Sequence, residues 1–240
     1  MKIDVVSPEE NFKGMSYGEW AAVWTKRLLS EDPDTYYGGD VLFLRGNINY
    51  KPTGELSDSP RHIDPQELHD RTRKNGETIY EGISIFVPVM TAYFTIGDVY
   101  DGRLVKTEED LRDFVNKDIN ETGTIWATII KKGNKKANKI VKNLKDYRIE
   151  SPLFKLTVSD KSPLKDKMET KQKTGIFDAI AGGYYLMIKS LPSGTYRIFF
   201  GGKGRGPYYT KSVYDIVVKG KKRNTLVDVS GTTKLPQLKW

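Results

Sequence analysis

Apolar residues near the start of the chain recur at helical spacing. The segment 16–29 carries one apolar stripe at positions i, i+3, i+4 and i+8, formed by Trp20, Val23, Trp24 and Leu28. Ser16 and Glu19 add the S-x-x-E pattern of a capping box just before this stripe. A second helix is expected over 107–116, where Thr107 precedes an acidic turn and an apolar face. Both helices fall in the first half of the sequence.

Most of the remaining chain has the pattern of β-strands. Apolar or alternating runs separated by turn residues predict strands over 41–44, 79–96, 125–130, 139–141, 154–158, 183–188, 195–200 and 208–218, with a further short strand at 226–229. A glycine-rich turn is expected over 201–206. Strands with turn signals every ~8–12 residues are typical of sandwiches and barrels. The pattern therefore predicts a mainly β fold, an antiparallel, jelly-roll-like β-sandwich with two or three short helices at its N-terminal side.

A single domain with an insertion and a tail accounts for the length of the chain. With 240 residues the chain suits one large β domain, which we expect over residues 1–220. Residues 51–78 are polar and interrupted by three prolines, so we expect an exposed insertion with a short helix beginning near Asp64. Residues 221–240 form a mixed C-terminal extension that ends on Trp240. Because chain ends fray unless something holds them, we expect this extension to dock on a neighbour.

Several segments resemble a widespread, uncharacterised bacterial family whose members are mostly exported. The Y-G-E-W-A-A-x-W helix of that family is similar to residues 17–24, and its next strand to Phe43–Gly46. A strand ending in F-x-P resembles 85–88, and the motif Y-R-V-x-S-P-x-F resembles 147–154. A final D-G-Y-W signature with L-P-x-G and F-G-G resembles residues 182–202. The family has no established reaction, so the resemblance implies a shared architecture and no activity.

The N-terminus departs from the exported pattern of that family. Its first residues contain no apolar stretch of the length found in a signal peptide. No apolar run in the sequence approaches the ~18 residues of a membrane span. We therefore expect cytoplasmic synthesis without a cleaved signal, and a final location in a virion or at a cell surface.

Positive charge is concentrated in one segment. The chain has 39 Lys and Arg against 31 Asp and Glu, a formal net charge of +8. Residues 131–148 hold eight basic residues and one acid, Asp146, so seven net positive charges come from this segment. A hairpin of this kind would bind the phosphates of nucleic acid without base specificity. The favoured interpretation is a solvated hairpin whose lysines discourage edge-to-edge strand pairing. The candidate interaction residues in it are Lys131, Lys132, Lys135, Lys136 and Lys139.

The glycine-rich turn carries two further candidate interaction residues, Lys203 and Arg205. It resembles a phosphate-binding loop, but such a loop needs G-K-[ST] running into a helix. Here Pro207 and a predicted strand follow, so a flexible hairpin loop is the better interpretation. Its two basic side chains could still contact an anion or a neighbouring subunit.

Residues suited to catalysis or metal binding are few. There is no cysteine, and the two histidines, His62 and His69, lie in the polar insertion. Together with Asp64 they could form an oxygen and nitrogen metal site, but their spacing matches no standard ligand motif. No nucleophile has a base in an evident motif. We therefore expect no cofactor and no enzymatic activity, and a solvated loop at the histidines.

Three functions remain open at this point. The first is a structural subunit of a larger assembly, such as a virion or surface layer, that contacts copies of itself or other subunits. The second is a carbohydrate- or ligand-binding β-sandwich, assisted by Ca²⁺ from acidic loops. Each tyrosine doublet, such as 184–185, is expected to place one ring in the core and one outward, where it would suit sugar or protein contacts. An enzyme that uses carboxylates ranks third.

Overall fold

The described residues form two packed six-stranded β-sheets, a small two-stranded hairpin and two α-helices. The computed structural model describes residues 3–29, 37–38, 40–46, 48–49, 76–161, 173–205 and 209–220. The first sheet has the strand order β1 (Tyr37–Gly38), β2 (Val41–Phe43), β5 (Ser84–Thr95), β12 (Gly175–Ile188) and β10 (Arg148–Glu150), and β11 (Phe154–Val158) also pairs with β12. The second sheet has the order β3 (Ile48–Asn49), β14 (Tyr209–Lys219), β13 (Gly194–Lys203), β8 (Ile125–Lys131) and β9 (Asn138–Lys139), and β4 (Gly76–Tyr80) also pairs with β14. A separate small hairpin joins β6 (Val99–Tyr100) to β7 (Arg103–Leu104).

The predicted mainly β, sandwich-like class is confirmed. Most neighbouring strands are antiparallel, as expected for a sandwich. Two pairs among the described strands are parallel, β2 with β5 and β4 with β14, so both sheets are mixed. The predicted strand over 154–158 agrees with β11.

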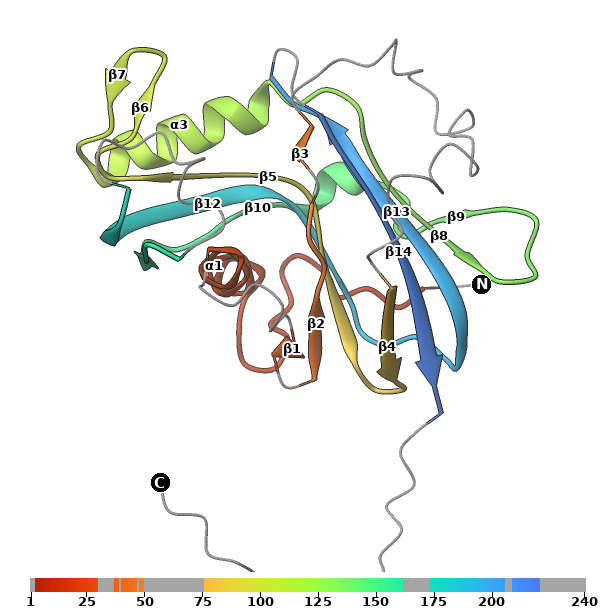
Figure 1. The fold of residues 1–240 in the computed structure, drawn as a ribbon. Coiled ribbons are helices and arrows are strands. Elements are labelled where there is room, and N and C mark those ends of the chain that lie inside the picture. Colours follow the sequence, from red (N-terminus) through yellow and green to blue (C-terminus); the bar gives the residue numbers. More distant parts are fainter. Residues whose placement is uncertain are drawn as a thin grey trace, which may run out of the picture.

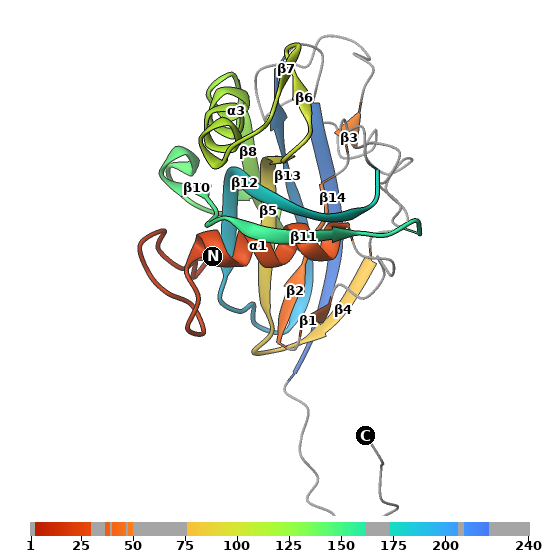
Figure 2. The same cartoon turned by 90° about the vertical axis from the view of Figure 1, so that its left-hand side faces the viewer.

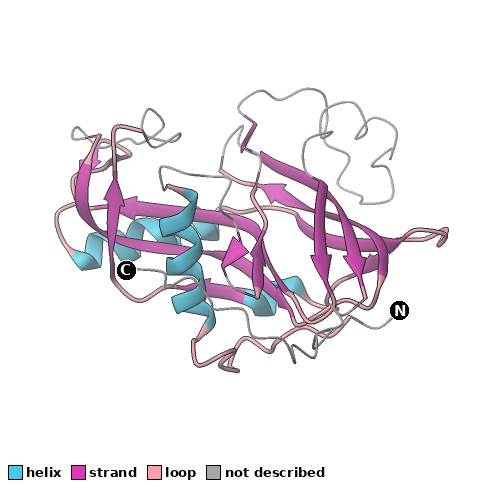
Figure 3. Ribbon diagram, turned by 60° about the horizontal axis from the view of Figure 1, so that its bottom comes forward, coloured by secondary structure: helices cyan, strands magenta, loops and turns pink. Residues whose placement is uncertain are grey.

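The first sheet forms the middle layer of the molecule. Helix α1 (Tyr17–Leu28) covers one of its faces, where Trp24 packs with Phe86 and Tyr185. Its other face packs against the second sheet and against helix α3 (Glu108–Asn120). Figures 1 and 3 show the two helices gathered toward one end of the molecule and the second sheet at the other. Figure 2 shows α1 running across the strands of the first sheet.

The first sheet is covered on both faces, so the expectation that one ring of the 184–185 tyrosine doublet points outward is wrong. Successive residues of a strand point to opposite faces, and Tyr184 and Tyr185 do enter different core clusters. Both rings are nevertheless buried, at 8 % and 0 % exposure. The outward ring was expected because a sandwich sheet usually has one solvated face, whereas here α1 covers the face that Tyr185 occupies.

The helix starts follow the sequence pattern closely. At α1 the Ser16 hydroxyl accepts a hydrogen bond from the Glu19 amide, and the Glu19 carboxylate accepts one from the Ser16 amide at 2.7 Å. Thr107 and Asp110 make the same reciprocal capping box at α3. Helix α3 continues to Asn120, four residues beyond the expected end at 116. In space α3 lies over β5 and β12 (Figure 1). In the sequence it falls in the middle of the chain, so the expectation that the helices lie at the N-terminal side holds for α1 and not for α3.

The expected glycine-rich turn over 201–206 is partly wrong. Gly201, Gly202 and Lys203 belong to strand β13. A Cβ on Gly201 would overlap the backbone oxygen of Thr210, and one on Gly202 would lie 2.8 Å from the side chain of Ile125. These glycines therefore allow close approach of the neighbouring strands and do not form a turn.

Candidate interaction surfaces

The segments that carried the family resemblance meet in the core. The indole of Trp24 donates a hydrogen bond to the Leu44 carbonyl at 2.8 Å, and Tyr185 stacks on Phe86 with ring centroids 5.4 Å apart. Gly18 packs so closely against β10 that a Cβ there would lie 2.6 Å from the Glu150 carbonyl oxygen. These residues position α1 on the first sheet. Their role in the described structure is packing, and they form no solvent-facing site.

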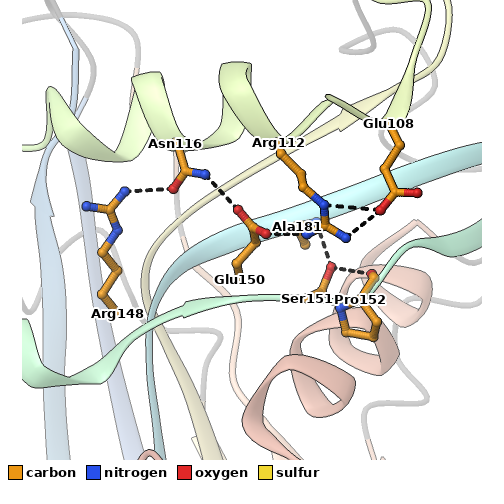
Figure 4. Close-up of polar contacts among 8 residues, drawn as sticks. All are labelled: Glu108, Arg112, Asn116, Arg148, Glu150, Ser151, Pro152 and Ala181. Carbon is orange, nitrogen blue, oxygen red and sulfur yellow. Dashed lines mark hydrogen bonds and ion pairs between the residues drawn. The ribbon is translucent and has the colours of Figure 1, made fainter. Parts of the chain in front are cut away.

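A chain of polar side chains fastens α3 to strand β10 (Figure 4). Arg148 donates to the Asn116 side-chain oxygen at 2.8 Å, and the Asn116 amide donates to Glu150 at 2.7 Å. Glu150 forms an ion pair with Arg112, which also pairs with Glu108 at 2.6 Å. Each charged group in this chain has a partner of opposite charge or an amide partner. These contacts therefore hold α3 against β10, and Arg112 partly neutralises Glu108 and Glu150 within them.

A second cluster of this kind holds Arg205. Its guanidinium pairs with Asp101 at 2.6 Å and Glu121 at 2.8 Å, and it lies over the ring of Tyr100, 5.1 Å from the centroid. Hydrogen bonds from Arg205 and Lys117 lower the pKa of Asp101, and burial raises the pKa of Tyr100 to about 12. Arg205 thus joins the end of β13 to the β6–β7 hairpin and α3. Its predicted contact with an anion or a neighbouring subunit stays a prediction.

Asp98 is the most deeply buried carboxylate among the described residues, at 5 % exposure. Its Oδ2 accepts hydrogen bonds from the Thr95 amide at 2.6 Å and from the Thr95 hydroxyl at 2.9 Å, while Oδ1 has no hydrogen-bond partner in the described structure. Burial raises the pKa of Asp98. A buried carboxylate of this kind is typical of catalytic sites. Here its contacts hold the turn between β5 and β6, since the Asp98 amide also donates to the Thr95 carbonyl at 3.1 Å.

The lysine hairpin, residues 131–145, differs from both polar clusters. Strand β8 pairs with β13 along its length, and β9 turns back against β8 with Lys139 opposite Thr128. Figure 1 shows the hairpin extending beyond the body of the second sheet. Lys131 at its base lies over the Tyr196 ring and donates to the Ser193 carbonyl at 3.2 Å. The other lysines are exposed and form no ion pair with any described residue: Lys132, Lys135, Lys136, Lys139, Lys142 and Lys145.

The outer face of the second sheet is a surface that sequence reasoning did not single out. Its inner residues, such as Ile129, Ile198 and Ile216, belong to the core between the sheets. The alternate residues therefore point away from that core. We call this side the outer face; its described apolar residues are Tyr80, Trp126, Ile130, Phe199, Val213 and Val217. Strand β8 has apolar residues on both of its faces, and this pattern in the sequence is the signal that could have identified the outer face.

The outer face is apolar at its centre and still partly exposed. Phe199 lies opposite Thr128 of β8 and Val213 of β14, and Trp126 lies opposite Gly201, which has no side chain. Trp126, Ile130 and Phe199 are half-buried, while Tyr80 and Val217 are each 38 % exposed. In the same face, Arg197 pairs with Asp215 through two hydrogen bonds, at 2.5 and 2.7 Å. The exposed faces of sandwich sheets are usually polar, so the apolar composition of this partly exposed face is unusual.

Several predicted site residues lie outside the described part of the structure. These are the metal candidates His62, Asp64 and His69, and the terminal Trp240. Lys203 is described and exposed, and its side chain forms no ion pair with a described residue. Within the described ranges, no group of three or more His, Cys, Asp or Glu side chains is placed to hold a metal ion. No described helix has the length and apolar character needed to cross a membrane.

Comparison with known proteins found no match among family models, curated proteins or solved structures. The family resemblance of the sequence motifs therefore stays a prediction. A functional proposal for this chain must come from its own surfaces.

Proposed function

We propose that this protein is a non-catalytic structural subunit that associates with a second copy of itself through the outer face of the second sheet. The observation that carries the proposal is the group of partly exposed apolar side chains around the buried Val213 on that face. Large exposed apolar patches on soluble domains commonly mark interaction sites, and aromatic residues are enriched at the centres of interfaces.

Charge on the outer face favours a second copy as the partner. The chain as a whole has a net charge of +8, which opposes self-association. At the centre of the face, however, Arg197 and Asp215 neutralise each other. Two copies can therefore bring the centre of this face together without placing like charges in contact there, because the lysines of the same face, Lys203, Lys211 and Lys219, lie toward the ends of β13 and β14. A face that packs on itself gives a closed, two-fold pair.

A pair formed in this way would be the unit of a larger assembly such as a virion or surface layer. Growth beyond the pair requires another contact. The C-terminal extension that ends on Trp240 is the segment for which the sequence predicts docking on a neighbour. Carbohydrate binding stays an alternative prediction.

The proposal is tested by sedimentation velocity of the full chain over a range of protein concentrations. We expect the wild type to sediment as a dimer that dissociates on dilution. The variant Phe199→Lys places a charge at the centre of the apolar face and should be a monomer throughout. Ile176→Lys is the matched control, because Ile176 is an apolar residue of the first sheet that is already 71 % exposed. It should leave association unchanged.

Circular dichroism and the unfolding midpoint should show that both variants are folded. A wild type that remains monomeric at the highest concentration would contradict the proposal. So would a dimer that Phe199→Lys leaves intact, because the association would then use another surface.

A further inference from the structure

The lysine hairpin is the one large cluster of charge that the described part of the fold leaves unneutralised. Elsewhere, Arg112, Arg197 and Arg205 each have a carboxylate partner within the chain. In the hairpin, by contrast, six exposed lysines between residues 132 and 145 have no such partner in the described structure. The only acid of the segment, Asp146, accepts a hydrogen bond from the Asn143 amide. Like charges gathered on one hairpin repel one another, and a bound anion would relieve that repulsion.

The hairpin is attached firmly at its base. Strand β8 is hydrogen-bonded to β13 over seven registered residue pairs, from Ile125 to Lys131. The returning chain forms a short 3₁₀ turn, Leu144–Tyr147, and both of these end residues pack against the core between the sheets. The lysines are therefore presented from a fixed platform. A backbone fixed at its base loses less backbone entropy on binding than a disordered tail of the same composition.

The residue types favour a polyanion over a protein or a membrane as the partner. Lysine is depleted from protein–protein interfaces, whereas nucleic-acid interfaces are strongly positive. The turn Lys132-Gly133-Asn134-Lys135-Lys136-Ala137 carries no large apolar side chain that would enter a lipid bilayer. Lysine stems are long and flexible, so their ammonium groups can follow phosphates spaced along a strand. We propose that the lysine hairpin binds the phosphodiester backbone of nucleic acid without base specificity.

This binding has a defined dependence on salt. Each phosphate neutralised by a lysine releases condensed counterions, so affinity falls as salt is added. If four to six of the exposed lysines contact phosphates, the logarithm of the association constant should fall against the logarithm of salt concentration with a slope of about −4 to −5 on duplex DNA. The proposal does not depend on self-association through the outer face, because the two surfaces use different side chains.

The test is fluorescence anisotropy of the full chain with labelled oligonucleotides of mixed sequence, about 20 nucleotides long, between roughly 50 and 200 mM salt. Single-stranded DNA, single-stranded RNA and duplex DNA are compared, which shows the form of nucleic acid that supplies the phosphates. The hairpin variant is Lys135→Glu with Lys136→Glu. The matched control is Lys106→Glu with Lys161→Glu, the same change in net charge at two exposed lysines outside the hairpin.

We expect the hairpin variant to bind roughly 10- to 100-fold more weakly at the lowest salt and to lose about 2 units of the salt slope. The control should keep the wild-type slope. The proposal is overturned if the wild type does not bind any of the oligonucleotides at the lowest salt. Equal losses in the two variants would also overturn it, because net charge alone would then explain the binding. Retention on vesicles containing phosphatidylserine without binding to oligonucleotides would replace it with a membrane contact.

Discussion

The two sheets of this protein are built from similar strands but differ in what covers them. The first sheet has α1 on one face and the second sheet with α3 on the other, so its central strands are buried on both sides. Within the described ranges, the second sheet packs against the core on its inner face, and its outer face keeps partly exposed aromatic and aliphatic residues around the buried Val213. A strand with apolar residues on both of its faces therefore has a different cause in each of the two sheets. In the first sheet this pattern reflects burial within the chain, and in the second it accompanies the partly exposed outer face that we propose as an interface.

The largest effect should come from removing a ring from the doubly covered sheet. Tyr185 is fully buried, stacks on Phe86 and contacts Trp24 edge-on. Tyr185→Ala should lower the free energy of unfolding by about 4 kcal/mol, because the lost contacts leave a cavity. The corresponding change on the outer face, Phe199→Ala, should cost only about 1–2 kcal/mol in the dilute monomer. Urea unfolding followed by circular dichroism measures both values.

These two substitutions separate the interpretations of the two sheets. If Phe199→Ala destabilised the dilute protein as much as Tyr185→Ala, the outer face would be part of the internal core. The two sheets would then not differ in how they are covered, and the outer face would no longer support the proposed self-association.

An intermediate effect is expected at the start of α1, the helix that covers the first sheet. Ser16→Ala removes the hydroxyl that accepts a hydrogen bond from the Glu19 amide, which is one of the two hydrogen bonds of the capping box. Loss of such a cap costs about 1 kcal/mol. Ser7→Ala is the matched control, because the Ser7 hydroxyl bonds only to the exposed Glu9 side chain and caps neither α-helix. It should change the free energy of unfolding by less than about 0.5 kcal/mol. Equal values for the two variants would show that α1 does not depend on its cap.

Local sequence patterns predicted the elements that are determined by interactions between residues close in the sequence. The caps at Ser16 and Thr107 satisfy backbone groups within one turn, and β11 alternates apolar and polar residues over its whole length. Both features can be seen in a few neighbouring residues.

Strand β12 shows where this reasoning stops. Its first half, Gly175–Gly182, lies outside the predicted strand over 183–188, and it contains glycine and alanine, which are depleted in strands. In the structure a Cβ on Gly182 would overlap the Val115 side chain of α3, and one on Gly183 would overlap the backbone oxygen of Met90. Small residues are required at these positions because elements distant in the sequence pack closely against them. The outer face was missed because a strand that is apolar on both faces, as β8 is, does not itself show whether another element covers its second face.

The smallest effect should come from Asp98 and should depend on pH. Burial raises the pKa of Asp98 above its ordinary value near 3.8. The protonated carboxyl is therefore favoured in the folded state, and its contribution to stability is complete below pH 3.8 and is lost as pH rises through the folded pKa. Asp98→Asn retains an oxygen that can accept from the Thr95 amide but cannot ionise. Measured by urea unfolding between about pH 3 and 7, the free energy of unfolding of the variant should therefore improve relative to the wild type as pH rises. Parallel curves would mean that Asp98 reaches solvent when charged, and that the turn after β5 is more open than the 5 % exposure of Asp98 indicates.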